Sequence, residues 1–188
     1  DILLVNNTHS NNKTIIIDFN NIQNEEYLHQ WKFLPSGMYD QFKKLIATKH
    51  QCKVNILYSS GMYETRYSHM SKIKTEHFRY PVCNSITKKK GMNCIYSNCD
   101  KGMFGIPKVI WSNGIGTYPI VDNNGNYGLT QFSYAIIDEL SNLETICNYL
   151  KNPIFIELMN YVKYTNNKYN YQVIKQFHKH FYNLPLIL

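Results

Sequence analysis

The residues of this chain that could do chemistry on their own do not form a complete catalytic set. Glu64, Lys74 and Glu76 lie close together in YETRYSHMSKIKTEHF, and carboxylates with a nearby lysine are groups that a metal-dependent nuclease can use. The acidic residue that should precede them on a strand is hard to place. Motifs of phosphate-binding loops, dinucleotide folds, serine hydrolases and zinc proteases are absent. We therefore predict no catalytic residue, and a stand-alone metal-dependent nuclease stays an alternative.

The cysteines could bind a metal or form disulfides. There are five of them: Cys52, Cys83, Cys94, Cys99 and Cys147. An odd number without paired spacing argues against a disulfide framework. Cys94 and Cys99 stand in NCIYSNCD, with Cys83 and His77 not far away, so a metal site is a second possibility. We favour reduced thiols and an intracellular location, and we predict no metal ligands.

The charge of the chain favours a polyanionic partner. Lys and Arg total 20 against 13 for Asp and Glu, which gives a formal net charge of +7. An excess of this size suits nucleic acid, which is the commonest polyanion in cells. The chain also holds 16 tyrosines, whose rings offer flat stacking surface with a polar tip.

Basic and aromatic residues alternate in three loop-like segments. MYETRYSH places Arg66 between Tyr63 and Tyr67, and SITKKKGMN places three lysines before a glycine. KYTNNKYNY near the C-terminus contributes Asn167 and Lys168. Loops on a rigid scaffold commonly carry binding residues, although each of these segments alone could be an ordinary solvated loop. Three of them in one basic chain favour nucleic-acid binding.

The residue types divide the expected DNA contacts into two roles. We expect Lys88, Lys89 and Lys90 to contact phosphates, because they form a run without an apolar pattern. The planar fork of Arg66 suits a guanine edge, while Asn113 and Gln131 suit adenine. The remaining expected contacts are Tyr67, Lys108, Asn167 and Lys168.

The second half of the chain resembles a known family. The segments GIPKVIWSNGIGTYPIVDNNGNYGLTQFSYAIID, LETICNYLKNPIFIELM and KYNYQVIKQF are similar to the C-terminal target recognition domain of adenine-specific DNA methyltransferases. Single-chain restriction-modification enzymes carry a fused domain of this type. The resemblance covers about residues 77–182. The positions that carry it are Pro107, Lys108, Val109, Ile110, Asp122, Gly125, Tyr127, Thr130, Asn152 and Phe155.

This resemblance implies sequence-specific recognition of double-stranded DNA. It also implies a catalytic methyltransferase domain in the same parent chain, which would use S-adenosylmethionine. The catalytic motif of the [NDS]-P-P-[YF] kind and the glycine motif for S-adenosylmethionine are absent from these residues, so we expect no cofactor in this piece. A non-catalytic protein-interaction module, whose charge only keeps it soluble, is a further alternative.

The order of the expected strands and helices, which must position these residues, predicts a mixed α/β (α+β) fold. We expect a twisted, mostly antiparallel central sheet and C-terminal helices. We expect one domain over 1–188, with a leading α/β segment at 1–58, a loop-rich sheet at 59–138 and helices at 139–188. Helices are predicted near 25–34 and 36–51, the second capped by Ser36. Asn124-Gly125 predicts a hairpin, and Pro153 predicts the start of a helix.

The ends of the chain carry two further expectations. The sequence begins at Asp1 within the apolar stretch DILLV, so we expect a fragment of a longer protein. No run of transmembrane length and no signal peptide is present in these residues, and we expect no membrane partner.

Overall fold

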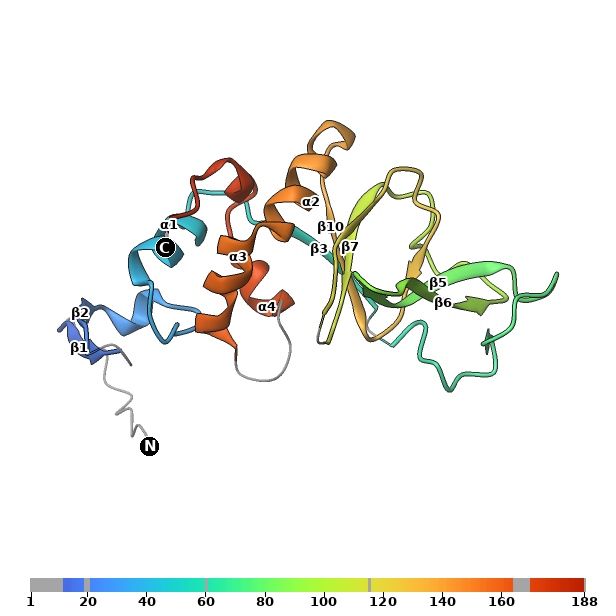
Figure 1. The fold of residues 1–188 in the computed structure, drawn as a ribbon, viewed down its shortest axis with the longest axis horizontal. Coiled ribbons are helices and arrows are strands. Elements are labelled where there is room, and N and C mark those ends of the chain that lie inside the picture. Colours follow the sequence, from blue (N-terminus) through green and yellow to red (C-terminus); the bar gives the residue numbers. More distant parts are fainter. Residues whose placement is uncertain (1–11, 19–20, 60, 115, 164–169, 188) are drawn as a thin grey trace.

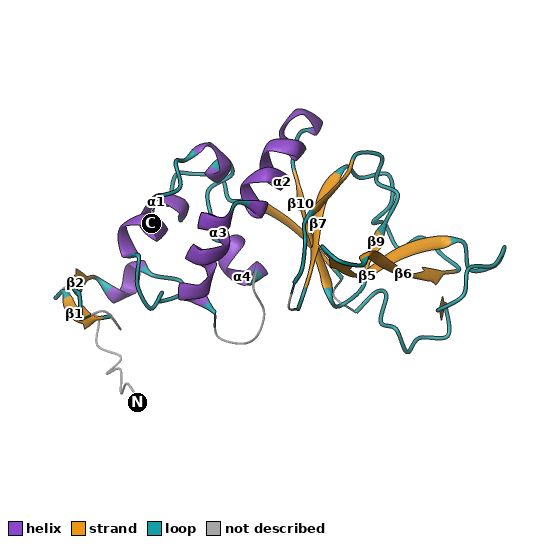
Figure 2. Cartoon of the chain, in the orientation of Figure 1, coloured by secondary structure: helices purple, strands orange, loops and turns teal. Residues whose placement is uncertain are grey.

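The structure of this protein is a computed structural model that describes residues 12–18, 21–59, 61–114, 116–163 and 170–187. Its strands are β1 (Thr14–Ile17), β2 (Gln23–Glu26), β3 (Asn55–Tyr58), β4 (Met70–Ser71), β5 (Tyr80–Thr87), β6 (Gly91–Ser97), β7 (Lys108–Ser112), β8 (Ile120–Asp122), β9 (Gly128–Leu129) and β10 (Ser133–Ile137). Its α-helices are α1 (Tyr39–Leu45), α2 (Leu143–Lys151), α3 (Pro153–Leu158) and α4 (Tyr171–Ile174). Helices gather at one end of an elongated molecule and the β5–β6 hairpin forms the other (Figures 1 and 2).

A four-stranded antiparallel sheet lies at the middle of the molecule. Its strand order is β3-β10-β7-β8. Along β7, Val109 and Trp111 belong to the core shared with the helices, whereas Ile110 belongs to the core on the opposite face. Successive side chains of a strand point to opposite faces, so every residue of β7 is buried only because both faces are covered.

The second sheet covers the face of the middle sheet that the helices leave free. Its strand order is β4-β6-β5-β9, and β5 pairs with β6 antiparallel and with β9 parallel. Val82 of β5 and Leu129 of β9 are fully buried in the same core as Ile110 and Ala135 of the middle sheet. The molecule therefore has three layers, which are helices, middle sheet and second sheet (Figure 1).

The helical layer joins residues from both ends of the chain. Phe42 of α1 lies in the same buried cluster as Leu150 of α2 and Phe155 of α3. Helix α3 begins at Pro153, as the sequence predicts, and the side chain of Asn152 accepts a hydrogen bond from the backbone N–H of Ile154 at 2.9 Å. This cap satisfies a backbone donor that a helix start otherwise leaves unpaired.

The structure confirms the predicted mixed α/β class, with mostly antiparallel sheets and C-terminal helices; β5 and β9 pair in parallel. Several local predictions are wrong. Residues 25–34 do not form an α-helix, because 23–26 pair with 14–17 as a β-hairpin and only a 3-10 turn, η1 (Leu28–Gln30), follows. Helix α1 begins after Met38, whose φ is 59°, and Ser36 does not cap it.

Residues 59–104 do contain long loops, before β4 and between β4 and β5, but they also contain the β5–β6 hairpin, which the sequence did not predict. Asn124-Gly125 does form a turn, but the strands on either side of it enter different sheets. The hairpin predicted at this turn is therefore wrong. In the part of the chain that the structure describes, no helix combines the length and apolar character needed to cross a membrane.

Candidate nucleic-acid interface

The β5–β6 turn presents the predicted phosphate contacts. Thr87 pairs with Gly91, so residues 88–90 form a three-residue loop that closes at a glycine with φ of 68°. Lys88, Lys89 and Lys90 are all exposed. Among the described residues, no carboxylate lies within 4.0 Å of their ammonium groups. We call residues 88–90 the basic turn, which carries three positive charges without local neutralisation.

The basic turn is fixed against the end of β7. The Ser112 hydroxyl donates to the carbonyl oxygen of Ile86 at 3.1 Å and accepts from the Ile86 N–H at 2.9 Å. Thr87 forms a β-bridge with Thr117, and the Lys88 N–H donates to the carbonyl oxygen of Gly116 at 3.3 Å. These bonds hold the lysines on a rigid scaffold next to the segment that follows β7.

Asn113 and Gln131 lie near each other, but neither has both side-chain amide atoms available to a base. The Asn113 backbone N–H donates to the carbonyl oxygen of Phe132 at 2.7 Å, and its side-chain amide donates to the Tyr134 hydroxyl at 2.9 Å. The side-chain oxygen of Gln131 is buried and has no hydrogen-bond partner. A bidentate contact with adenine needs both amide atoms, so each residue would have to rearrange before it could read a base.

A hollow on the second sheet offers amides that the sequence did not identify. It has a volume of about 470 Å³ and is lined by residues including Lys72, Asn84, Asn93 and Phe132. Phe132 is 45% exposed, although it is large and apolar. We call this surface the amide hollow. Amides can bind base edges, an aromatic ring can stack and a lysine can contact phosphate.

A β-bulge positions one of these amides. Cys83 pairs with Cys94 and Ser85 pairs with Asn93, so Asn84 is the extra residue between the two pairs. A bulge changes the direction of a side chain at the point where it interrupts a ladder. The Asn84 amide oxygen accepts from the Thr130 hydroxyl at 3.4 Å, which ties β5 to the segment before β10.

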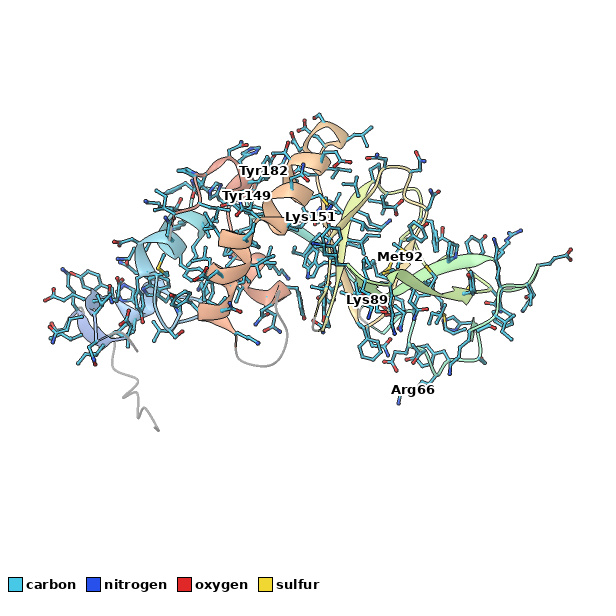
Figure 3. The ribbon with its side chains drawn as sticks, in the orientation of Figure 1. Arg66, Lys89, Met92, Tyr149, Lys151 and Tyr182 are labelled. Atoms are coloured by element: carbon cyan, nitrogen blue, oxygen red, sulfur yellow. The ribbon has the colours of Figure 1, made fainter. Side chains whose placement is uncertain are left out.

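Arg66 lies on the loop between β3 and β4 and points away from the body of the molecule (Figure 3). Its guanidinium pairs with Glu64 at 2.7 Å, and its side chain is 78% exposed. Tyr67 contacts His69, with 5.3 Å between ring centroids. Tyr63 does not flank Arg66 as an exposed ring, because it is fully buried and burial raises its pKa to about 12.

The expectation that Lys108 contacts DNA is wrong, because its side chain faces the interior of the protein. Its side chain is 0% exposed, and its ammonium lies 3.0 Å from Asp122. It also donates to the carbonyl oxygens of Met103 at 3.2 Å and Ile106 at 3.0 Å. All three ammonium protons therefore have acceptors inside the protein. Asn167 and Lys168, also expected to contact DNA, lie outside the described residues.

The structure adds no support for the nuclease site or the metal site that the sequence left open. The Glu64 carboxylate is paired with Arg66, and Glu76 is exposed on a loop. No cluster of three His, Cys, Asp or Glu side chains suited to a metal occurs among the described residues. Burial raises the pKa of the Cys83 thiol strongly and that of Cys94 to about 11, which opposes thiolate chemistry at this pair.

Comparisons with known proteins identify no relative of this chain. No family model matches the chain, and neither a curated protein nor a solved structure matches it.

Proposed function

We propose that this chain recognises specific sequences in double-stranded DNA, as the recognition module of an adenine-specific DNA methyltransferase or a fused restriction-modification enzyme. The observation that carries the proposal is the basic turn, whose three exposed lysines have no carboxylate partner among the described residues. The net charge of +7 and the resemblance of residues 77–182 point the same way.

The proposed division of labour separates affinity from specificity. The basic turn contacts phosphates, which fix position without reading sequence. The amide hollow supplies a base contact through Asn93, and Arg66 exchanges Glu64 for a guanine edge. The buried Lys108 is therefore not among the proposed DNA contacts, which all come from side chains that solvent can reach.

The remaining parts of the proposal concern the parent protein. A catalytic domain in the same parent chain binds S-adenosylmethionine and transfers the methyl group, while this module positions the DNA. An intracellular location follows from the DNA target. It agrees with the five cysteines, all of which are free thiols.

Duplex binding measured over a range of salt concentrations tests the proposal. Each neutralised phosphate contributes about −0.9 to the slope of log K against log salt. The variant Lys88→Ala/Lys89→Ala/Lys90→Ala should therefore bind every duplex more weakly, with a slope shallower by about 2.7. Lys13→Ala is the matched control, because Lys13 is exposed, directly precedes β1 and pairs with Glu25 at 3.4 Å. An unchanged slope in the triple variant would remove the basis of the proposal.

A further inference from the structure

A second basic surface runs across the helical end of the molecule. Two hollows, of about 820 and 590 Å³, both have Lys32 and Gln176 in their walls and therefore adjoin each other. Neither the basic turn nor the amide hollow contributes a residue to them. We call the two together the lysine groove, after the lysines that line it: Lys32, Lys43, Lys49, Lys53 and Lys175.

The charges of the lysine groove are largely uncompensated. No Asp or Glu lines either hollow. Among the described residues, the carboxylate that pairs with a lysine of the groove is Glu26, which is 4% exposed, lies 2.6 Å from Lys43 and accepts from the Trp31 indole N–H at 3.1 Å. Five lysines and one carboxylate leave four positive charges. A surface of this kind concentrates anions.

Aromatic rings lie between the lysines of the groove. Tyr58 is 37% exposed, and the Lys175 ammonium lies 5.8 Å from its ring centroid. Tyr171 contacts Tyr58 with 5.4 Å between ring centroids, and Trp31 lines the other hollow. Grooves that bind unpaired nucleic acid combine cations that follow the backbone with aromatic rings on which bases stack.

From this arrangement we infer that the lysine groove binds an unpaired strand of nucleic acid. The lysines contact its phosphates and Tyr58 stacks on a base. A duplex keeps its bases stacked inside and offers no base face to Tyr58, whereas a single strand can place both phosphates and base faces against the groove. An acidic peptide would use the lysines but would leave the aromatic rings without a role.

Fluorescence anisotropy with a short labelled oligothymidylate tests this inference on the whole chain. Lys32→Ala/Lys49→Ala should weaken oligothymidylate binding and make the salt slope shallower by about 1.4, because each single-strand phosphate contributes about 0.7. Tyr58→Ala should weaken binding about fivefold or more, while Tyr58→Phe should retain it. Thermal unfolding of each variant checks that these exposed positions leave the fold intact.

Reciprocal controls separate this inference from the proposed duplex site. The Lys32→Ala/Lys49→Ala variant should bind duplex DNA as the wild type does, and Lys89→Ala should bind oligothymidylate as the wild type does. The inference is overturned if the groove variants bind oligothymidylate normally, or if they weaken duplex binding by the same factor. Equal competition by polyglutamate, with no difference between Tyr58→Ala and Tyr58→Phe, would assign the groove to acidic peptides.

Discussion

Lys108 and Asp122 form an ion pair of 3.0 Å whose side chains are only 0% and 1% exposed. The Asp122 carboxylate also accepts from the backbone N–H groups of Asn126 at 2.8 Å and Tyr127 at 3.1 Å. The pair thus links β7 to the turn after β8, where the chain leaves the middle sheet for the second sheet. Lys108 and Asp122 therefore fix the start of this crossing between the two sheets.

Breaking this pair should destabilise the fold. Lys108→Met leaves a buried carboxylate without its cation, which costs about 3–5 kcal/mol in the free energy of unfolding. The double variant Lys108→Met/Asp122→Asn should lose less than the sum of the two single variants, because the residues interact directly. Urea denaturation measures all four proteins. Additive losses would show that the pair is not coupled.

Gly125 should tolerate a side chain less well than other glycines with positive φ. Its φ is 66°, and an added Cβ would lie 2.2 Å from the backbone nitrogen of Ile106. Gly102 has φ of 86° but has open space around it. Gly102→Ala should therefore cost about 1 kcal/mol, for the backbone conformation alone. Gly125→Ala should cost clearly more, and equal losses in urea denaturation would contradict the close approach.

These examples show which parts of the fold the sequence could predict. Pro153 fixes the start of α3 through its own geometry, so a local signal was enough. The β5–β6 hairpin was missed because the bulge at Asn84 breaks the alternation of β5. The helix predicted near 25–34 failed because strand pairing with residues 14–17 outweighed its helical spacing.

The candidate site likewise has one part that the sequence could predict and another that it could not. The basic turn is a run of like residues and can be found without a structure. The amide hollow brings together Lys72, Asn93 and Phe132, which only the strand register and the turn before β10 make neighbours. Lys108 was assigned to DNA because nothing local reveals that Asp122, on another strand, pairs with it inside the protein.

Alkaline pH should destabilise the protein partly through Tyr63. Burial raises the pKa of its phenol from 10.0 to about 12, so the unfolded chain releases this proton at lower pH than the folded chain does. Its contribution to stability is complete below pH 10 and is lost as the pH rises towards 12. Tyr63→Phe should reduce the fall in unfolding free energy over this range, by up to about 1.4 kcal/mol per pH unit. An unchanged slope would show that the phenol is solvated.

The residues proposed to contact base edges, Arg66 and Asn93, should affect sequence preference, whereas the residues proposed to contact phosphates should not. Asn93→Ala and Arg66→Ala should each cost about 1–3 kcal/mol on the preferred duplex and little on random DNA. Lys89→Ala should weaken binding to both alike. Competition binding with preferred and random duplexes measures the difference. If Lys89→Ala changes the preference while Arg66→Ala and Asn93→Ala do not, the division of roles is wrong.

Selection of bound sequences from a pool of randomised duplexes, at near-physiological salt and with Mg²⁺ present, tests sequence-specific recognition most directly. The account predicts enrichment of one short sequence that survives intact, and loss of that enrichment in the Arg66→Ala/Asn93→Ala variant. Retention of duplexes without any enriched sequence, failure to retain duplexes, or their cleavage by the chain would each contradict it.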